Sequence, residues 1–172
     1  FQLQRIGRYH IQRKLGEGGM GVVYLAEHGI LKSPVAIKLL GTHRTVDDAA
    51  RKRFETEARH TSRLIHPNTI RIYDFGATDD GTLYYAMEYV EGVDLAKLVS
   101  LWGVPPPERT VHLVVQACRS LQHAHEHKVI HRDVKPANFV ISGLSSQPDH
   151  LKVLDFGLAK ILEDRGPGED SV

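Results

Sequence analysis

Residues 131–138 read His131-Arg132-Asp133-Val134-Lys135-Pro136-Ala137-Asn138, and Asp155-Phe156-Gly157 follows after a short gap. Asp133 can accept the proton of an attacking hydroxyl group. Asn138 and Asp155 offer the hard oxygen ligands that Mg²⁺ prefers, and Lys135 supplies a point charge for a moving phosphate. The alternative is that Asp133 and Asp155 are ordinary turn residues. That alternative would not explain why Lys135 and Asn138 accompany them. The two motifs together therefore predict a phosphoryl-transfer site.

A glycine cluster lies near the N-terminus, in the sequence Gly16-Glu17-Gly18-Gly19-Met20-Gly21-Val22-Val23. Glycines let backbone amides approach phosphate oxygens without obstruction by Cβ atoms. A dinucleotide-binding fold has a similar pattern, but there a helix follows the glycines. Here an apolar run predicts a strand instead. We therefore expect a phosphate-covering hairpin rather than a plain turn, with Gly16, Gly18 and Gly21 in its loop.

Two charged residues occupy apolar settings. Lys38 shares a predicted strand face with Ala36 and Leu40, where an unpaired ammonium group would be costly. In the helix predicted over 47–64, Glu57 is the only charge on a stripe that includes Phe54. These positions predict a Lys38–Glu57 ion pair. The alternative for Glu57 is a surface pair with Arg53, one turn earlier.

Sequence periodicity divides the chain into two parts. Alternating apolar residues predict five strands in the first part, and helical spacing dominates the second. A break at Glu91-Gly92-Val93 separates them, so we expect domains at 1–90 and 91–172, joined by a hinge at 88–91. The predicted strands are 9–15, 22–27, 35–40, 70–75 and 83–89 in the first domain and 139–141 and 151–154 in the second. The predicted helices are 47–64, 94–101 and 108–127.

Composition excludes several classes of protein. The 172 residues carry 22 Lys and Arg against 21 Asp and Glu, a net charge of +1, which does not favour nucleic acid as a partner. No apolar run reaches the length of a membrane span, about 18 residues. Cys118 is the only cysteine, so an internal disulfide is excluded. Because Cys118 lies in an apolar helical run, we expect it to be a small core residue.

The catalytic-loop, glycine and Asp-Phe-Gly motifs resemble those of protein kinases. The resemblance extends from Tyr9 to Lys160 and includes Arg53-Phe54-Glu55-Thr56-Glu57-Ala58 and His66-Pro67-Asn68. Phrases such as Asp155-Phe156-Gly157-Leu158-Ala159-Lys160 look like bacterial Ser/Thr kinases of the eukaryotic type. The resemblance implies an α+β, two-lobed fold with a five-stranded antiparallel first lobe and one main helix. The second part would be the first, mostly helical portion of the other lobe.

The family resemblance also implies roles for individual residues. Asp133 would be the catalytic base, with Lys135, Lys38 and Glu57 in the catalytic set, and His131 would pack under Phe156. Asn138 and Asp155 would bind Mg²⁺. Met87 would guard the back of the adenine pocket. The residues implied in ATP binding are Leu15, Gly16, Gly18, Gly21, Val23, Ala36, Lys38, Met87, Glu88, Val90, Asp94 and Val140.

The form His-Arg-Asp-x-Lys is similar to Ser/Thr kinases, so the implied substrate is a protein with a Ser or Thr acceptor and the implied cofactors are ATP and Mg²⁺. Two alternatives stay open. A pseudokinase scaffold would usually lack Lys38, Asp133 or Asp155. A small-molecule phosphotransferase would not be expected to have Lys135-Pro136 or this glycine loop. The sequence does not give the oligomeric state.

Two further expectations concern context. The chain ends inside the segment that corresponds to a kinase activation segment, so we expect it to be poorly active alone. The resemblance implies a cytoplasmic location, either free or as the cytoplasmic part of a membrane-tethered protein, with no membrane contact by this segment. His123 and His127 lie one helical turn apart, but no third ligand accompanies them, so a metal site there is not expected. Thr61 departs from the family, where a larger apolar residue is common.

Overall fold

The computed structural model describes residues 5–19, 21–41, 48–143 and 149–157, which form two compact units. One unit contains the described residues up to Ser62 together with Ile72–Tyr89. The other contains Arg63–Arg71 together with Val90–Gly157. The chain therefore passes into the second unit twice, whereas the sequence predicted one crossing near residue 90. Predicted features that fall on Asp47, on 144–148 and on 158–172 lie outside the described residues.

The first unit is built on an antiparallel sheet of six strands in the order β1-β2-β3-β4-β6-β5. Its interior contains Ile6, Tyr9, Ala26, Ile37 and Ala86, all buried. All five predicted strands are present. The additional strand, β1, has two residues, pairs with β2 and forms an edge of the sheet. The strands are β1 (Arg5–Ile6), β2 (Tyr9–Gly18), β3 (Gly21–His28), β4 (Pro34–Leu40), β5 (Ile72–Ala77) and β6 (Leu83–Glu88).

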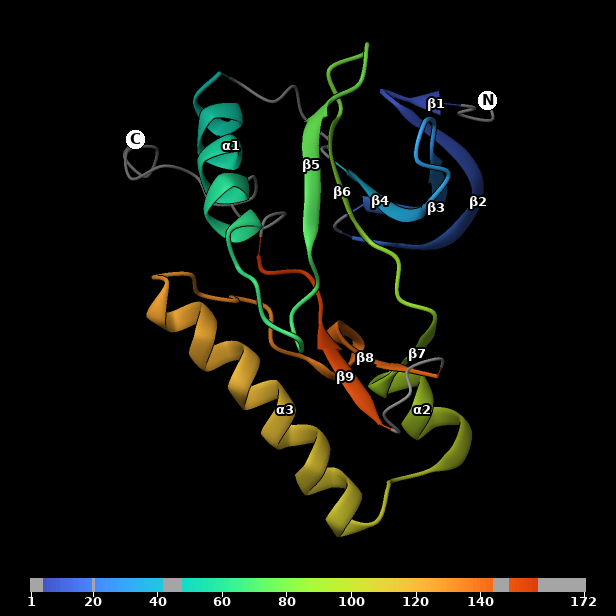
Figure 1. Cartoon of the computed structure of the whole chain (residues 1–172), viewed down its shortest axis with the longest axis vertical. Coiled ribbons are helices and arrows are strands. Elements are labelled where there is room, and N and C mark those ends of the chain that lie inside the picture. Colours follow the sequence, from blue (N-terminus) through green and yellow to red (C-terminus); the bar gives the residue numbers. More distant parts are fainter. Residues whose placement is uncertain (1–4, 20, 42–47, 144–148, 158–172) are drawn as a thin grey trace, which may run out of the picture. The chain divides into compact units, whose positions relative to one another are not determined.

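Helix α1 (Asp48–Ser62) packs beside β5 in the first unit (Figure 1). Phe54 and Ala58 are fully buried on its inner face, and the Phe54 ring meets Phe75 edge to face at 6.3 Å between centroids. Thr61 lies on the same face and is also buried, but its hydroxyl has no hydrogen-bond partner among the described residues. The departure noted in the sequence therefore leaves a polar atom unsatisfied in an apolar contact.

Replacement of Thr61 by Val should stabilise the protein. The change removes a buried hydroxyl without altering the side-chain shape, so we expect the free energy of unfolding to rise by about 1 kcal/mol. Urea unfolding measures the difference. Thr56→Val is the matched control, because the exposed Thr56 hydroxyl donates to Lys52 O at 2.9 Å. A Thr61→Val protein less stable than the parent would contradict this account of the site.

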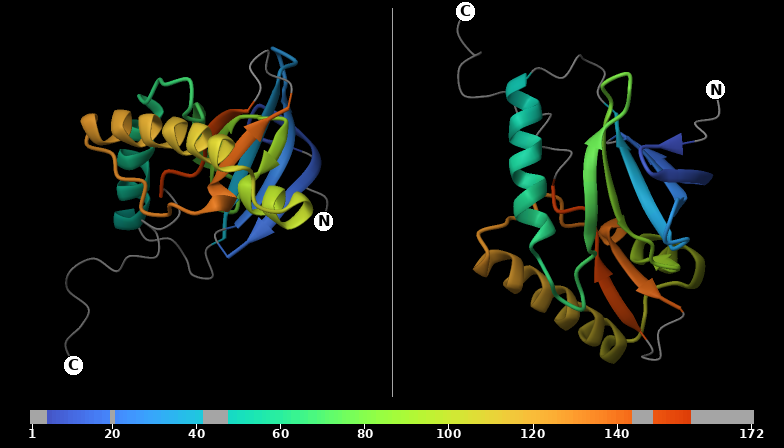
Figure 2. Two further views of the ribbon diagram at one scale, coloured as in Figure 1. Left: turned by 90° about the horizontal axis from the view of Figure 1, so that it is seen from below. Right: turned by 45° about the horizontal axis from the view of Figure 1, so that its top comes forward.

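The second unit combines a three-stranded sheet, in the order β7-β8-β9, with two helices and a 3-10 turn. Figure 2 shows the long helix α3 lying across β9. Buried residues of this core include Leu98, Leu113, Ile141, Leu151 and Phe156. The elements are β7 (Gly92–Asp94), α2 (Leu95–Trp102), α3 (Pro107–Glu126), η1 (Pro136–Asn138), β8 (Phe139–Ser142) and β9 (His150–Val153). None of the described helices is long and apolar enough to cross a bilayer.

The prediction for Cys118 was wrong, because its side chain is exposed. The buried stripe of α3 consists of Leu113, Gln116, Ala117, Ser120 and Ala124. Cys118 follows Ala117 directly and is therefore rotated about 100° away from this stripe. It lies instead with Val111, Val114 and Val115, which are exposed on the other side of the helix.

A polar network attaches residues 63–71 to the second unit. Asn68 Nδ2 donates to Gln116 Oε1 and to Leu151 O, both at 2.8 Å. Thr69 and Ser120 share a hydrogen bond of 2.7 Å between their buried hydroxyls. The backbone continues the pattern, since Val153 N donates to Asn68 O at 2.8 Å. These bonds explain why the segment belongs with α3 and β9 although it follows α1 in sequence.

Candidate functional site

The predicted catalytic loop begins with a buried histidine. His131 Nε2 donates to Leu154 O at 2.7 Å, and Asp133 N donates to His131 Nδ1 at 3.2 Å. The His131 ring lies 4.7 Å from the Phe156 ring, between centroids, which confirms the predicted packing of these two residues. Both ring nitrogens are therefore occupied by structural hydrogen bonds. His131 is suited to position the loop rather than to transfer protons.

Three predicted site residues meet at the Asp133 carboxylate. Lys135 Nζ lies 2.8 Å from Asp133 Oδ2, and Asn138 Nδ2 donates to the same oxygen at 3.0 Å. Asn138 Nδ2 also donates to Asp133 O at 2.7 Å. The turn η1 brings Asn138 back toward Asp133. The backbone N–H of Asn138 donates to Lys135 O at 2.9 Å. Asp133 is thereby held in one orientation by a cation and an amide.

Asp155 lies beyond the end of β9, not at the end of a strand that reaches Leu154 as the sequence predicted. Its φ of 52° is in the left-handed region, so the backbone turns sharply here. Leu154 N donates to Asn138 O at 2.8 Å, which connects the segment before Asp155 to the catalytic loop. Strained conformations of this kind concentrate at functional sites, where the surrounding contacts maintain them.

The donor atoms fit a hard divalent cation. Because Asn138 directs its amide nitrogen to Asp133, its Oδ1 is on the opposite side of the same amide group. This oxygen and the Asp155 carboxylate are the ligand types that Mg²⁺ binds, usually together with water and phosphate oxygens.

The glycine hairpin in the first unit contains two kinds of glycine. At Gly16 and Gly18 a Cβ atom would meet nothing within 4 Å, so packing within the described chain does not require glycine there. Gly21 differs, because its φ is 124° and a Cβ would lie 1.9 Å from Leu39 O. Gly21 is therefore required by the fold, whereas Gly16 and Gly18 leave the backbone open to an external ligand such as a phosphate.

Lys38 and Glu57 both lie in the first unit. Lys38 is only 5% exposed, on β4 between Val23 of β3 and Tyr85 of β6 in the sheet register. Glu57 is half-buried on α1. On the same helix, Arg51 Nε lies 3.2 Å from Glu55 Oε1. The Lys38–Glu57 ion pair stays a prediction.

The predicted nucleotide-binding residues are distributed over both units. Ala36 and Met87 are buried neighbours in the β4–β6 register. Leu15, Val23, Glu88 and Val90 are half-buried. Asp94, predicted to reach a ribose, also caps α2: its Oδ1 accepts from Lys97 N at 2.8 Å. An Asp before an apolar helical run is a common cap, so this role was visible in the sequence. Val140 pairs with Asp94 across β7 and β8.

Comparison with known proteins gives the family. The protein kinase domain family, Pkinase, matches residues 9–172, and the chain therefore belongs to this family. It is 43% identical over 162 residues to the serine/threonine-protein kinase pkn3 of Myxococcus xanthus, covering 93% of this chain and 30% of pkn3. It is 42% identical over 156 residues to PrkC of Bacillus subtilis, covering 91% of this chain and 23% of PrkC.

A crystal structure of the Mycobacterium tuberculosis PknI kinase domain matches with a TM-score of 0.77 and 34% identity. The match covers 88% of this chain and 59% of the PknI chain. The chain thus spans less than a third of these curated relatives and about three fifths of this solved kinase domain. The predicted two-lobed kinase fold is confirmed for the part that the chain contains.

Two histidines should make the protein less stable in acid. Burial lowers the pKa of His131, against the opposing effects of Leu154 O, Asp155 and Asp133. Burial also lowers the pKa of His66, and His123, Arg119 and Lys152 lower it further. The folded state therefore binds fewer protons than the unfolded state, whose histidine pKa is about 6.5. Their stabilising contribution is complete above that pH and is lost as the pH falls through the folded pKa values.

We accordingly expect the Tm to fall between pH 7.5 and pH 5.5, with at most about 1.4 kcal/mol lost per pH unit for each histidine. His66→Asn provides the control. Asn68 N donates to His66 Nδ1 at 3.1 Å, and an Asn side-chain oxygen can accept the same bond without titrating. Thermal unfolding followed by circular dichroism should show a weaker pH dependence for the variant. An unchanged pH dependence would contradict the assignment to His66.

Proposed function

We propose that this chain is the nucleotide-binding and catalytic part of a protein kinase that phosphorylates serine and threonine hydroxyls on protein substrates. One observation carries the proposal: Lys135 and Asn138 both contact the Asp133 carboxylate, and Leu154 N connects Asn138 to the segment that presents Asp155. Phosphoryl transfer needs a base, a cation and hard oxygen ligands for a metal ion. The catalytic loop and the Asp155 segment, which are hydrogen-bonded to each other, contain all of these groups.

In the proposed reaction, a substrate hydroxyl oxygen forms a bond to the γ-phosphorus of ATP while the bond to the ADP oxygen breaks. The hydroxyl proton passes to the Asp133 carboxylate. Lys135, 2.8 Å from that carboxylate, offsets the negative charge that gathers on the transferred phosphate. Asn138 fixes Asp133 and, with Asp155, would hold Mg²⁺. When bound, this ion neutralises charge on the phosphate oxygens.

The first unit would supply most of the residues that bind ATP. The open backbone at Gly16 and Gly18 suits the phosphates, and the buried Lys38 would contact the α- and β-phosphates while paired with Glu57. Ala36 and Met87 would line the adenine site, with Leu15, Val23 and Val140, and backbone groups of Glu88 and Val90 would bond the adenine edge. Asp94 would use the carboxylate oxygen that does not cap α2 to reach the ribose.

This chain covers 59% of the solved PknI kinase domain and less than a third of the curated kinases that it matches. The exposed valines of α3, Val111, Val114 and Val115, form an apolar face of the kind that another element covers in a larger core. We therefore expect residues 1–172 to bind ATP but to transfer phosphate more slowly than a chain with the length of a solved kinase domain. We infer a cytoplasmic location for this activity, either in a free protein or in the cytoplasmic part of a membrane-tethered one.

The proposal is tested with radiolabelled ATP, Mg²⁺ and two peptides that differ only in the acceptor, Ser/Thr or Tyr. The proposal is supported if the Ser/Thr peptide becomes labelled and if this labelling requires both Mg²⁺ and Asp133. Tight ATP binding without transfer, in a chain long enough to complete the domain, would favour the pseudokinase alternative. Transfer to an aminoglycoside but not to a peptide would favour a small-molecule phosphotransferase.

A further inference from the structure

A basic groove lies in the second unit, and the proposed reaction uses none of its residues. It is a cavity of about 580 Å³, within the range of ordinary ligand sites. Its walls are contributed by α3, by residues 67–68 and by the start of β9, and none of them belongs to the catalytic loop or to the Asp155 segment. The lining residues are Pro67, Asn68, His112, Gln116, Arg119, Asp149 and His150.

The groups that can receive an anionic ligand in this groove are one guanidinium group and two imidazole rings. His112, Gln116 and Arg119 are spaced by four and three residues, so they follow one face of α3. His112 and Arg119 are exposed to solvent. From the opposite wall, His150 donates Nε2 to Pro67 O at 3.1 Å, which fixes its ring and leaves Nδ1 on the other side.

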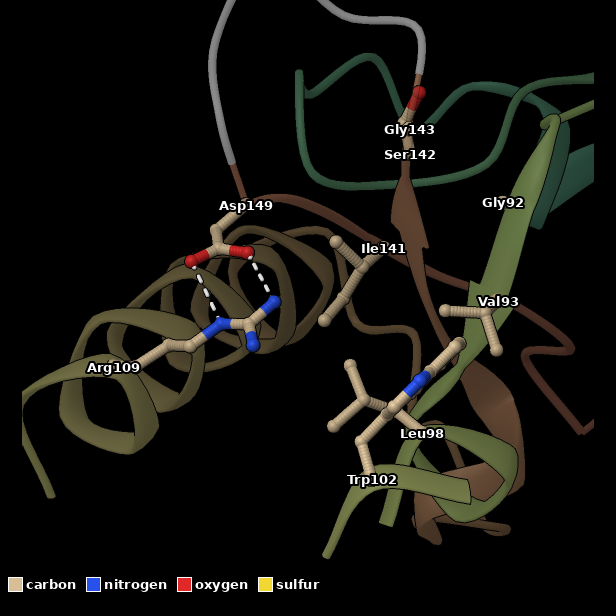
Figure 3. Close-up of a pocket in the computed structure, with 9 residues that line it drawn as sticks. All are labelled: Gly92, Val93, Leu98, Trp102, Arg109, Ile141, Ser142, Gly143 and Asp149. Atoms are coloured by element: carbon tan, nitrogen blue, oxygen red, sulfur yellow. Dashed lines mark hydrogen bonds and ion pairs between the residues drawn. The ribbon is translucent and has the colours of Figure 1, made fainter. Parts of the chain in front are cut away.

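Asp149 is the one acidic residue among the described residues of the lining, and an ion pair neutralises its charge. Arg109 donates Nε to Asp149 Oδ2 at 2.9 Å and an Nη atom to Asp149 Oδ1 at 2.7 Å, a bidentate pair that Figure 3 shows at the edge of a neighbouring pocket. Gln116 is equally committed. Its Oε1 accepts from Asn68 and from Leu151 N at 2.9 Å, and its Nε2 donates to Asp149 O at 2.8 Å. These hydrogen bonds fix the base of the groove. Because Asp149 is paired with Arg109, the remaining charged group among the described lining residues is Arg119.

A row of imidazole rings extends along the same side of α3. His66, His123 and His127 stack in series, with centroid distances of 5.4 Å and 4.3 Å. After burial, the repulsion of His123, Arg119 and Lys152 is what lowers the pKa of His66. Among the described residues, no three His, Cys, Asp or Glu side chains are arranged to hold a metal ion. Arg119 and Lys152 therefore place positive charge on this side of α3, which favours an anionic ligand.

We propose that this groove binds a phosphoserine or phosphothreonine segment of a partner protein, with the phosphate on Arg119. This inference rests on the proposed function, because such segments are the products of a Ser/Thr kinase. The Arg119 guanidinium can contact two phosphate oxygens at once. His112 begins seven residues earlier on the helix, about 10 Å away, a distance that three residues of an extended peptide span. An acidic residue three positions from the phosphate would therefore reach His112.

Fluorescence anisotropy tests the proposal with a labelled peptide that contains phosphothreonine and a glutamate three residues before it. We expect salt-sensitive binding that Arg119→Ala weakens by roughly tenfold, because a charge-assisted pair is lost. The matched control is Arg13→Ala, which removes the same charge from an exposed position on β2 and should leave affinity unchanged. The same peptide without phosphate should bind at least tenfold more weakly than the phosphopeptide.

Binding is measured without ATP and repeated with Asp133→Asn, so that it does not depend on phosphate transfer. If Asp133→Asn loses phosphate transfer but still binds the phosphopeptide, the two functions are separate. Phosphopeptide binding can be measured even if the proposed kinase activity fails. Equal binding by Arg119→Ala, equal binding of the peptide without phosphate, or no binding by the parent protein would each overturn the proposal. Circular dichroism of Arg119→Ala verifies that its fold is retained.

Discussion

Replacement of Asp133 by Asn should lower kcat for peptide phosphorylation by roughly 10²–10⁴-fold, the usual contribution of a positioned general base. The substitution removes the group that accepts the hydroxyl proton but preserves an oxygen for Lys135 and Asn138, which now contact Asp133 Oδ2 at 2.8 Å and 3.0 Å. The KM for ATP should change little, because Asp133 is proposed to act on the acceptor. The measurement requires a chain long enough to show transfer before the substitution.

Asp79→Asn is the control for loss of an acid, because Asp79 is exposed in the turn between β5 and β6. It should retain full activity. Thermal unfolding of both variants then distinguishes a chemical effect from a folding defect. If Asp133→Asn transferred phosphate within a factor of about three of the parent rate, less than 1 kcal/mol of barrier would depend on this carboxylate. The proposed role of Asp133 would then be wrong.

Much of the catalytic loop could be predicted from sequence because its contacts are local. Asp133, Lys135 and Asn138 lie within six residues, so one tight turn suffices to bring them together. The five main strands were equally accessible. Val35, Ile37 and Leu39 alternate along β4 and enter one buried core, which is the pattern that period-two spacing detects.

The features that sequence analysis missed depend on distant partners. The sequence predicted a break at Glu91-Gly92-Val93, yet Gly92–Asp94 forms β7 by pairing with β8 (Phe139–Ser142). Arg63–Arg71 follows α1 without interruption, and only its hydrogen bonds to Gln116, Leu151 and Val153 assign it to the second unit. Local periodicity carries no information about such pairings.

The ends of helices were also difficult to predict from the sequence. Helix α1 ends at Ser62, although the stripe that predicted it extends to Leu64. Leu64 is buried nonetheless, because it packs in the core of the second unit with Leu113 and Leu151. A buried apolar residue at helical spacing thus belonged to a different core. The prediction that Cys118 is a core residue was wrong for a related reason. A shift of one residue along a helix is enough to move a side chain from the buried face to an exposed one.

Replacement of Gly92 by Ala should destabilise the second unit by about 2–3 kcal/mol, at the upper end of overpacking effects. A Cβ at Gly92 would lie 2.0 Å from Ile141 O and 2.8 Å from its carbonyl carbon. These are backbone atoms of the adjacent strand, so no side-chain rotation relieves the clash. Strands β7 and β8 would have to separate, and Asp94 and Val140, which pair across them, would move with the strands.

Because Asp94 and Val140 are both proposed to contact ATP, Gly92→Ala should weaken ATP binding as well as lower the Tm, although Gly92 itself is not proposed to touch the nucleotide. Gly143→Ala is the matched control. It lies immediately after β8, has nothing within 4 Å of the added Cβ, and should leave both quantities nearly unchanged or raise the stability slightly. Calorimetry of ATP binding and thermal unfolding measure the two effects. If both variants unfolded at the parent temperature, the close approach of Gly92 to Ile141 would not constrain the fold, and the positions proposed for Asp94 and Val140 would lose their structural support.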